Sequence, residues 1–235
     1  MKDQSTLPSG LVRLEKYMAQ SGMSSRREAK DLIVSGNISV NKKIIRETGF
    51  GINPSHDVVE ITGARPDKKS ILLFKPRGIE TSKTNSDSRD IHDAFPQFKN
   101  LAPIGRLDKD SEGLIILSDD GTLARAITGE KSNVEKEYIV TVRESVTPAA
   151  LERMARGIVL DAKKTLPAKT ARIGEHEFSI VLREGRKHQI RRMADACKLT
   201  IERLVRVRIG TVKIGNMKPG EFRNLAEEEI SSFKK

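Results

Sequence analysis

The stretch Gly105–Leu114, GRLDKDSEGL, separates apolar runs of this chain with a short, highly charged, turn-like segment. Within it, Asp108 directly follows an Arg-Leu pair. An aspartate in such a place is usually a turn or cap residue, because its carboxylate accepts hydrogen bonds from nearby backbone amides. The alternative is that Asp108 performs chemistry on a substrate that other parts of the chain bind. The rest of the sequence decides between these two interpretations.

The charge of the whole chain points to a polyanionic partner. The 235 residues include 43 Lys and Arg against 32 Asp and Glu, which gives a net charge of +11. Nucleic acid is the first partner class that such an excess indicates, although a ribosome-associated or acidic-protein partner also fits. Trp is absent and aromatic residues make up only 4% of the chain. This composition argues against a broad base-stacking platform for single strands.

Several other classes are disfavoured by composition. No apolar run approaches the roughly 20 residues that a membrane-spanning helix needs, and the N-terminal residues lack the apolar centre of a signal peptide. A single cysteine, Cys197, excludes an internal disulfide framework. The four histidines lie far apart and show no metal-ligand spacing. We therefore expect a cytoplasmic protein with no membrane segment and no metal site.

Residues 11–62 are typical of a compact module. Apolar residues at helical spacing predict a helix in LVRLEKYMAQ that ends at Gly22. Ser25 and Glu28 have capping-box spacing and predict a second helix, which ends at Gly36. The segment ISVNKKII then predicts two short strands around a turn at Asn41, and DVVEI predicts another strand.

The same module is strongly basic. Between Arg13 and Arg46 there are eight basic and three acidic residues, a net of +5. Such a cluster fits phosphate contacts, although a solvated polar face is the structural alternative. The residues that we expect to bind RNA here are Arg26, Arg27, Lys30, Lys42 and Lys43.

A polar linker, residues 63–69, precedes a larger domain that we place at residues 70–235. Strands are predicted in SILLFKPRGI, where Pro76 stops the strand, and in LIILSDD, EKEYIVTV, EFSIVLREG and LVRVRIGTVKIG. Helices are predicted in TPAALERMAR, QIRRMADACKL and AEEEISSF, the last with Asn224 and Glu227 at capping-box spacing. Many strands with few helices, and no regular βαβ alternation, indicate an α+β fold with a largely antiparallel mixed sheet flanked by helices.

A second basic cluster begins in the segment EGRKHQIRRM, Glu184–Met193. From Arg186 to Arg208 there are eight basic and two acidic residues, a net of +6. Such a density of positive charge would follow a phosphate backbone. We expect Arg186, Lys187 and Arg192 to contact RNA.

Two family resemblances organise these observations. The pattern RLEKYMAQSGMSSRREAKDLIVSGNISVNKK resembles the S-four-type RNA-binding module, whose helix pair and following turn hold structured RNA through phosphate contacts. The turn differs slightly, because Asn41-Lys42 stands where that family usually has Asn-Gly.

The order of KPRG, GRLDKDSEGL, KEY, EGR and QIRRM resembles the RsuA-type pseudouridine synthase family, and most of all its RluF-like branch. The resemblance extends from about residue 11 to the C-terminal helix. It implies the pseudouridine synthase fold and the isomerisation of one uridine in ribosomal RNA. Large-subunit (23S) rRNA is the substrate class that it favours, with small-subunit (16S) rRNA or tRNA as alternatives. One departure is His188-Gln189, where Arg-Gln is common.

The resemblance also implies the chemistry of Asp108. Pseudouridylation cuts the bond between uracil N1 and ribose C1′, turns the base and rejoins it through C5, so atom balance requires neither cofactor nor metal. The implied role of Asp108 is to attack C1′ or to remove a proton from C2′. Arg191 is the implied cationic partner of this carboxylate, with Arg192 as the alternative.

The remaining implied roles concern the extruded base. A uridine inside a stack must be flipped out before it can react. Arg106 resembles the family arginine that fills the vacated place, and Tyr138 resembles the tyrosine that stacks on the uracil. Leu107 and Ile190 would be apolar walls of the pocket.

Two alternatives of other classes remain open on the sequence. The basic clusters would also suit a non-catalytic RNA-binding factor in ribosome assembly. A metal nuclease would use Asp108 with Asp110, Glu112, Asp119 and Asp120. We expect a monomeric isomerase whose partner is ribosomal RNA or a pre-ribosomal particle. The target uridine and the role of His188 are not determined by the sequence.

Overall fold

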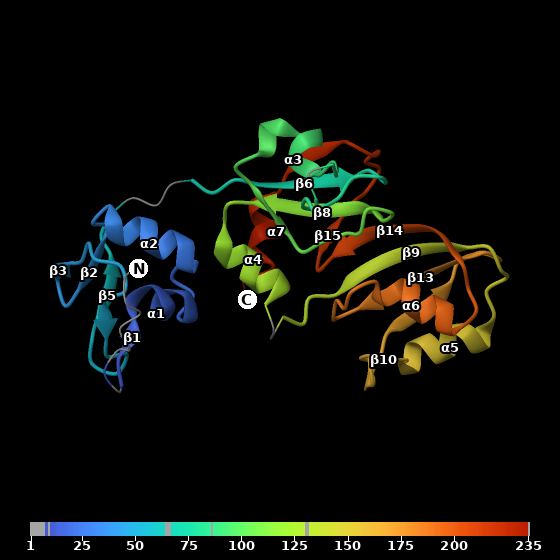
Figure 1. Ribbon diagram of the computed structural model, residues 1–235, viewed down its shortest axis with the longest axis horizontal. Helices are drawn as coiled ribbons and strands as arrows, with labels where there is room; N and C mark the ends of the chain where they lie inside the picture. The colour runs from blue at the N-terminus through green and yellow to red at the C-terminus, as the bar shows by residue number, and fades with distance from the viewer. Residues whose placement is uncertain (1–7, 9, 64–66, 86, 130–131, 235) are drawn as a thin grey trace. The chain divides into compact units, whose positions relative to one another are not determined.

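The structure, a computed structural model, describes residues 8, 10–63, 67–85, 87–129 and 132–234. The chain divides into two compact units (Figure 1). One contains the described residues up to Lys68, and the other contains most of the chain from Lys69 onward. The finer division into a module at 11–62, a linker at 63–69 and a domain at 70–235 stays a prediction.

The first unit packs two helices against short strands. Its elements are β1 (Val12–Arg13), α1 (Leu14–Gln20), α2 (Arg26–Val34), β2 (Ile38–Val40), β3 (Lys43–Ile44), β4 (Gly51–Ile52) and β5 (Val59–Ile61). Leu14, Met18 and Ile33 are fully buried in its core. The predicted capping box is present, because Ser25 Oγ accepts from the Glu28 amide at 3.2 Å and the Glu28 carboxylate accepts from the Ser25 amide at 3.4 Å.

The turn between β2 and β3 tolerates the Asn-Lys pair through side-chain contacts. Asn41 and Lys42 both have positive φ, 50° and 67°, which two-residue hairpin turns require. Asn41 donates through Nδ2 to Asp57 at 2.8 Å and accepts from the Val58 amide at 3.0 Å. These bonds hold the turn without the glycine that is usual at its second position.

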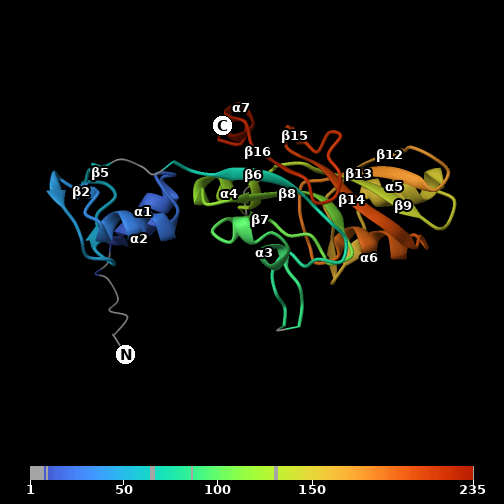
Figure 2. The ribbon, with the colours of Figure 1, turned by 90° about the horizontal axis from the view of Figure 1, so that it is seen from above.

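The second unit is built on one large mixed sheet with the strand order β12-β13-β9-β14-β8-β6-β16 (Figures 1 and 2). All neighbours along this path are antiparallel except β14 and β8. β15 pairs with β14, and β7 pairs with β8. The predicted α+β class with a largely antiparallel mixed sheet is confirmed. The strands are β6 (Ser70–Lys75), β7 (Ala102–Ile104), β8 (Glu112–Ser118), β9 (Lys136–Val142), β12 (Lys169–Arg172), β13 (Glu177–Leu182), β14 (Ile201–Ile209), β15 (Val212–Lys213) and β16 (Phe222–Asn224).

Helices and a small hairpin complete the fold. They are α3 (Ile91–Ala94), the 3₁₀ helix η1 (Pro96–Phe98), α4 (Gly121–Thr128), α5 (Pro148–Arg156), α6 (Gln189–Ala196), α7 (Glu227–Ser231) and the hairpin β10 (Val159–Leu160) with β11 (Lys163–Lys164). α5 and α6 cover one face of the β9 and β13 region (Figure 1). Val140, Phe178 and Met193 are fully buried there.

Two parts of the sequence prediction need correction. The short elements α3, η1 and β7 were not predicted, because each spans only three or four residues. The eight-residue helix α4 and the strand β12 were not predicted either. The C-terminal helix begins at Glu227 rather than after a cap at Asn224. Asn224 is instead the last residue of β16 and pairs with Ile71. Within the described ranges, no helix is long and apolar enough to cross a membrane.

Candidate active site

One cleft of about 350 Å³ in the second unit brings together segments that are far apart in the sequence. It is lined by Asp108 from the loop before β8, by Tyr138 from β9 and by Arg191 from α6. Leu204 and Arg206 of β14 also line it. The other predicted residues that line it are Arg106, Leu107, Arg186, Lys187 and Ile190. The three residues that the resemblance assigned to catalysis therefore share one cavity.

The loop that carries Asp108 is held on both sides. The buried hydroxyl of Thr81 accepts from the Leu107 amide at 2.9 Å and donates to the Leu107 carbonyl at 2.7 Å. The Ser111 amide donates to the Asp108 carbonyl at 3.0 Å. Further along, Gly113 has φ 108°, and a Cβ atom there would clash with the Arg206 carbonyl. The glycine of the EGL segment thus lets β8 approach β14 closely enough to pair with it.

Asp108 contacts a histidine rather than an arginine. Its Oδ2 atom lies 3.0 Å from Nδ1 of His188, and the Asp108 side chain is 38% exposed. His188 precedes α6 with φ 51°. This left-handed backbone is uncommon for a residue with a Cβ atom. His188, the histidine that stands where an arginine is common, therefore contacts the Asp108 carboxylate directly.

The predicted ion pair between Arg191 and Asp108 is wrong for this structure. Arg191 Nη2 instead donates to the Asp110 carbonyl at 3.0 Å and to Ser111 Oγ at 3.4 Å. Among the described residues, the side-chain partner of Asp108 within 4.0 Å is His188. Arg191 holds the backbone that follows Asp108, so its guanidinium is already engaged. The alternative partner, Arg192, is engaged elsewhere too.

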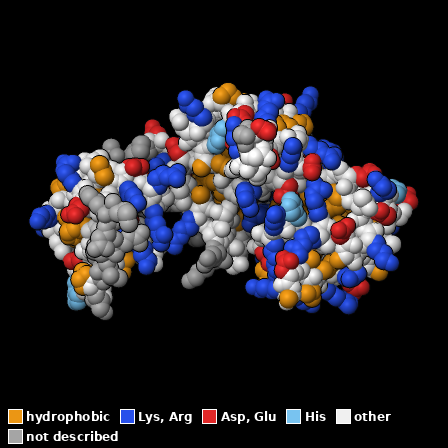
Figure 3. All heavy atoms as spheres, viewed as in Figure 1, with side chains coloured by type: hydrophobic (Ala, Val, Ile, Leu, Met, Phe, Trp, Pro, Cys, Tyr) orange, Lys and Arg blue, Asp and Glu red, His pale blue; other side chains and the backbone are white. Residues whose placement is uncertain are grey.

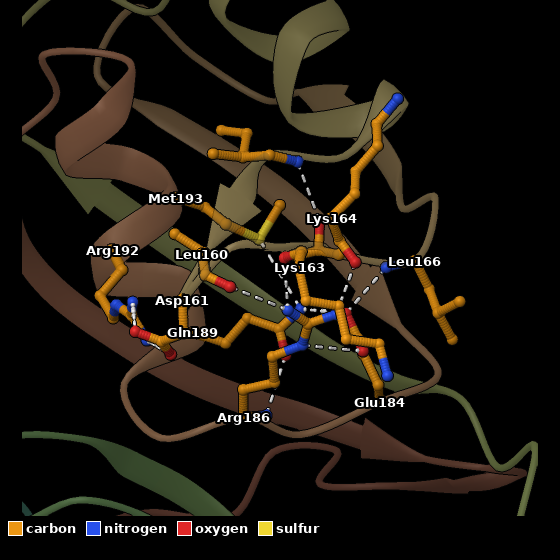
Figure 4. A network of polar contacts seen from close by, with 12 residues as sticks. Leu160, Asp161, Lys163, Lys164, Leu166, Glu184, Arg186, Gln189, Arg192 and Met193 are labelled. Atoms are coloured by element: carbon orange, nitrogen blue, oxygen red, sulfur yellow. Dashed lines mark hydrogen bonds and ion pairs between the residues drawn. The ribbon is translucent and has the colours of Figure 1, made fainter.

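Arg186 and Arg192 support the β10–β11 hairpin, as Figure 4 shows. Arg186 donates to the carbonyls of Lys163 at 2.8 Å and Lys164 at 2.6 Å, and its Nε atom lies 3.2 Å from Glu184. Both terminal nitrogens of Arg192 bind Asp161, at 2.8 and 2.7 Å. The guanidinium groups of Arg186 and Arg192 thus have partners within the protein, and their contacts with RNA stay a prediction.

The other predicted residues are placed as follows. Arg106 and Lys187 are exposed side chains on the cleft lining. Leu107 and Ile190 are buried, and Tyr138 is partly buried against the core clusters on both sides of it. An exposed arginine, a half-buried aromatic ring and two apolar walls around an accessible carboxylate can accommodate a planar base.

Sequence reasoning missed two cations of the cleft, Lys136 and Arg206. Lys136 lies two residues before Tyr138 on β9, and this period-two spacing could have revealed it, since such residues share a sheet face. Arg206 pairs with Tyr138 across β14. It is only 2% exposed. Its donors reach the carbonyls of Leu114 at 2.7 Å and Arg106 at 3.3 Å.

Lys75 of the KPRG segment lies beneath this site. It is fully buried, and its ammonium donates to the carbonyls of Pro76 at 2.9 Å and Ile79 at 2.6 Å. Burial lowers the pKa of Lys75 to about 8, while the carboxylate of Asp108 acts in the opposite direction. The side chain therefore supports the strand end and is not available for contact with RNA.

The acidic residues near Asp108 are dispersed. The carboxylate of Glu112 pairs with Arg203, and the amide of Lys69 donates to Asp119 at 2.9 Å. Over the part of the chain that the structure describes, no group of three or more His, Cys, Asp and Glu side chains could hold a metal ion.

The first unit has a basic hollow of its own. The hollow, of about 530 Å³, is lined by Arg13, Glu15, Lys16, Arg26, Arg27 and Lys30. Arg26, Arg27 and Lys30 are exposed on α2, and Lys42 and Lys43 are exposed at the β2–β3 hairpin. Figure 3 shows Lys and Arg side chains on the visible face of this unit. The predicted RNA-binding residues here are free to meet an anionic partner.

Comparison with known proteins gives consistent matches for both units. The family model described as RNA pseudouridylate synthase matches residues 69–196, and that of the S4 domain matches residues 12–59. The dual-specificity RNA pseudouridine synthase RluF of Escherichia coli (strain K12) is 36% identical in an alignment of 231 positions, which covers 95% of this chain and 79% of that protein. The ribosomal large subunit pseudouridine synthase B of Bacillus subtilis (strain 168) is 32% identical, covering 95% of this chain and 96% of that one. A crystal structure of a pseudouridylate synthase aligns with a TM-score of 0.70 at 29% identity, covering 94% of this chain and 99% of that one.

Proposed function

This chain belongs to the RNA pseudouridylate synthase family, and we propose that it isomerises one uridine of large-subunit (23S) rRNA with Asp108 as the essential group. The observation that carries this proposal is the position of Asp108. Its partly exposed carboxylate lies in a cleft with Tyr138, and most of the charged side chains that line the cleft are cationic. An RNA-modifying enzyme needs this combination, because its reacting group must meet a sugar that is embedded in negative charge.

Asp108 acts on the ribose of the flipped uridine. Its carboxylate either attacks C1′ or removes the proton from C2′, and the C1′–N1 bond breaks with its electron pair left on the uracil. The base then turns and C5 bonds to C1′. This step breaks the bond between Asp108 and C1′ in the first route, and in the second route the proton returns to C2′. The proton on C5 is then lost and N1 takes up a proton. The reaction conserves all the atoms of the nucleotide, so it consumes no cofactor.

The residues around Asp108 receive the flipped nucleotide. Flipping costs a few kcal/mol of unstacking, and we assign the filling of the vacated stack to the exposed Arg106. Tyr138 stacks on the uracil between the apolar walls Leu107 and Ile190. Arg191 has a positioning role, since its bond to the Asp110 carbonyl supports the loop that carries Asp108.

The S4 unit brings the RNA to the cleft. We assign its phosphate contacts to Arg26, Arg27, Lys30, Lys42 and Lys43, which are exposed and lie on one module. The large subunit is favoured because one of the similar proteins is described as a ribosomal large subunit enzyme. Small-subunit (16S) rRNA and tRNA are the alternative substrates, and the relative described as dual-specificity supports testing more than one RNA.

The decisive experiment is a chemical pseudouridine map of total RNA from cells that lack the protein. We expect one uridine of 23S rRNA to lose its modification, and the wild-type gene to restore it. Asp108→Asn should not restore it, whereas binding of the purified variant to rRNA should stay within about twofold of wild type. Asp110→Asn, a neighbouring acid outside the cleft lining, is the matched control and should restore the modification.

The same map tests the other function class. A map that does not change, with the protein still bound to rRNA, would favour the non-catalytic assembly factor. Full turnover by a folded Asp108→Asn variant would contradict the role assigned to this carboxylate.

A further inference from the structure

Two cations flank Tyr138 in the cleft without an assigned role: Lys136 is partly buried and Arg206 is buried. Lys136 lies on β9 two residues before Tyr138, so both side chains project from the same face of the sheet. Arg206 is the cross-strand partner of Tyr138 on β14. All three residues line the cleft that contains Asp108. Tyr138 thus has one cationic neighbour on its own strand, Lys136, and another on the adjacent strand, Arg206.

Neither cation has a carboxylate partner among the described residues. Lys136 donates to the Val134 carbonyl at 3.2 Å, and Arg206 donates to the carbonyls of Leu114 and Arg106. The third guanidinium nitrogen of Arg206, Nη2, is buried with no hydrogen-bond partner among these residues. The acids of the cleft lining, Asp108 and Glu184, are paired with His188 and Arg186 respectively.

This arrangement is costly in the unliganded protein. Removing a charge from water without a compensating partner costs several kcal/mol, and a buried donor without an acceptor adds a further penalty. Burial lowers the pKa of Lys136, and the nearby charge of Arg206 lowers it further. These two like charges, one partly and one fully buried, line one cavity and would be stabilised by a negative charge that arrives or develops within it.

We propose that Lys136 and Arg206 stabilise the negative charge that forms on the uracil when its bond to the ribose breaks. This inference rests on the proposed function. When the C1′–N1 bond breaks, its electron pair passes to N1 and is delocalised onto the carbonyl oxygens O2 and O4. A uracil stacked on Tyr138 presents these oxygens to the side chains beside the ring. The charge is consumed when C5 bonds to C1′, so the cations act only in the transition state and the intermediate.

This role predicts a specific kinetic signature. Preorganised donors aimed at developing charge are worth about 10²–10³-fold in rate. A base that carries negative charge more easily needs less of this help. Fluorine at C5 withdraws electrons, so 5-fluorouracil is a better leaving group than uracil. Loss of a stabilising cation should therefore harm the cleavage of uridine more than that of 5-fluorouridine.

The test uses a synthetic RNA fragment around the mapped target, with either uridine or 5-fluorouridine at that one position. The single-turnover loss of the parent nucleoside is followed by mass spectrometry at saturating protein. We expect Lys136→Met to slow the uridine RNA about 100-fold and the 5-fluorouridine RNA about 10-fold or less. Lys136→Arg, which keeps the charge, should recover most of the rate. Arg206→Gln, which removes the charge, should shift the ratio of the two rates in the same direction as Lys136→Met.

Lys213→Met is the matched control, because this exposed lysine of β15 lies outside the cleft lining and the substitution makes the same charge change. It should leave both rates unchanged. Equal losses on the two RNAs in Lys136→Met, or no loss at all, would overturn the inference and assign this lysine to folding or RNA binding. If Lys136→Met lowers stability, Lys136→Gln gives the same comparison. Failure of the wild-type protein to modify the uridine RNA would instead contradict the proposed function itself.

Discussion

At the scale of single residues, the site depends on charged groups held in unusual surroundings. Asp108 is partly exposed and bonded to His188 across 80 positions of sequence. Lys75 is fully buried, with two backbone carbonyls as its hydrogen-bond partners. An accessible carboxylate and a buried ammonium thus influence each other electrostatically. The state of Lys75 can be tested through the pH dependence of protein stability.

Lys75 should make the stability of the protein depend on pH above neutrality. Its pKa is about 8 in the folded protein, against 10.5 for an ordinary lysine. Between these values the unfolded chain binds more protons than the folded one, so the unfolding free energy rises with pH. The rise summed over this window is about 3 kcal/mol. Chemical denaturation at pH 7.5 to 10.5 should show it in the wild-type protein.

Lys75→Met is the comparison variant for this prediction. It removes the titrating group, so its unfolding free energy should lack this part of the rise. The difference between the two proteins, rather than either curve alone, isolates Lys75 from other groups that titrate at high pH. A constant difference across the window would contradict the lowered pKa.

At the scale of secondary-structure elements, the β10–β11 hairpin is stabilised by Arg186, from the segment between β13 and α6. Asp161 and Ala162 form its turn with φ 53° and 58°. Arg186 binds carbonyls of β11, and Glu184 accepts from the Leu166 amide at 2.8 Å (Figure 4). A two-residue strand pair has little stability of its own. The hairpin therefore depends on the segment that lines the cleft.

Arg186→Ala should loosen this hairpin selectively. Removal of the guanidinium leaves the Lys163 and Lys164 carbonyls without its donors, so amide hydrogen exchange in residues 159–166 should speed up by about tenfold or more. Exchange in β6 and β8 should change little. Lys163→Ala, which removes an exposed side chain of the same hairpin, is the control and should leave exchange there near the wild-type rate. Unchanged exchange in Arg186→Ala would show that the hairpin is stable without this arginine.

At the scale of the whole molecule, the positive charge is organised rather than spread evenly. The net charge is +11, and the first unit concentrates basic residues around one hollow. The cleft of the second unit is lined by further cations. Phosphate contacts release condensed counterions, so their number appears in the salt dependence of binding. Removing positive charge from the hollow should therefore change the salt dependence of RNA binding more than removing the same charge elsewhere.

The triple variant Arg26→Ala, Arg27→Ala and Lys30→Ala should weaken rRNA binding and flatten its salt dependence. The slope of log affinity against log salt should fall by about 0.7–0.9 for each lost phosphate contact, hence by about 2 to 3 in total. The measurement is the Kd at several salt concentrations. The matched control replaces three exposed lysines of the second unit, Lys99, Lys213 and Lys218, with alanine. If both triple variants change the slope equally, net charge rather than the hollow determines binding.

Local sequence signals predicted the ends of helices well where a few neighbouring residues determine the backbone conformation. Ser25 with Glu28 predicted the start of α2, and Thr147 before Pro148 is the N-cap of α5, accepting from the Ala150 amide at 3.2 Å. The prediction failed at Asn224, because pairing of β16 with β6 already uses that backbone. Capping is a local preference, and a neighbouring strand overrides it.

The sequence by itself determined the two-part organisation of charge, the fold class and the motifs that gather around Asp108. These depend on residue types and spacings within short segments. Only the tertiary structure decided which long side chains meet which partners. It gave Asp108 a histidine instead of Arg191, engaged Arg186 and Arg192 in the hairpin, and placed Lys136 and Arg206 beside Tyr138. The physical reason is that a guanidinium or ammonium at the end of a flexible chain binds the nearest acceptor in space, and the sheet sets that distance between segments far apart in the sequence.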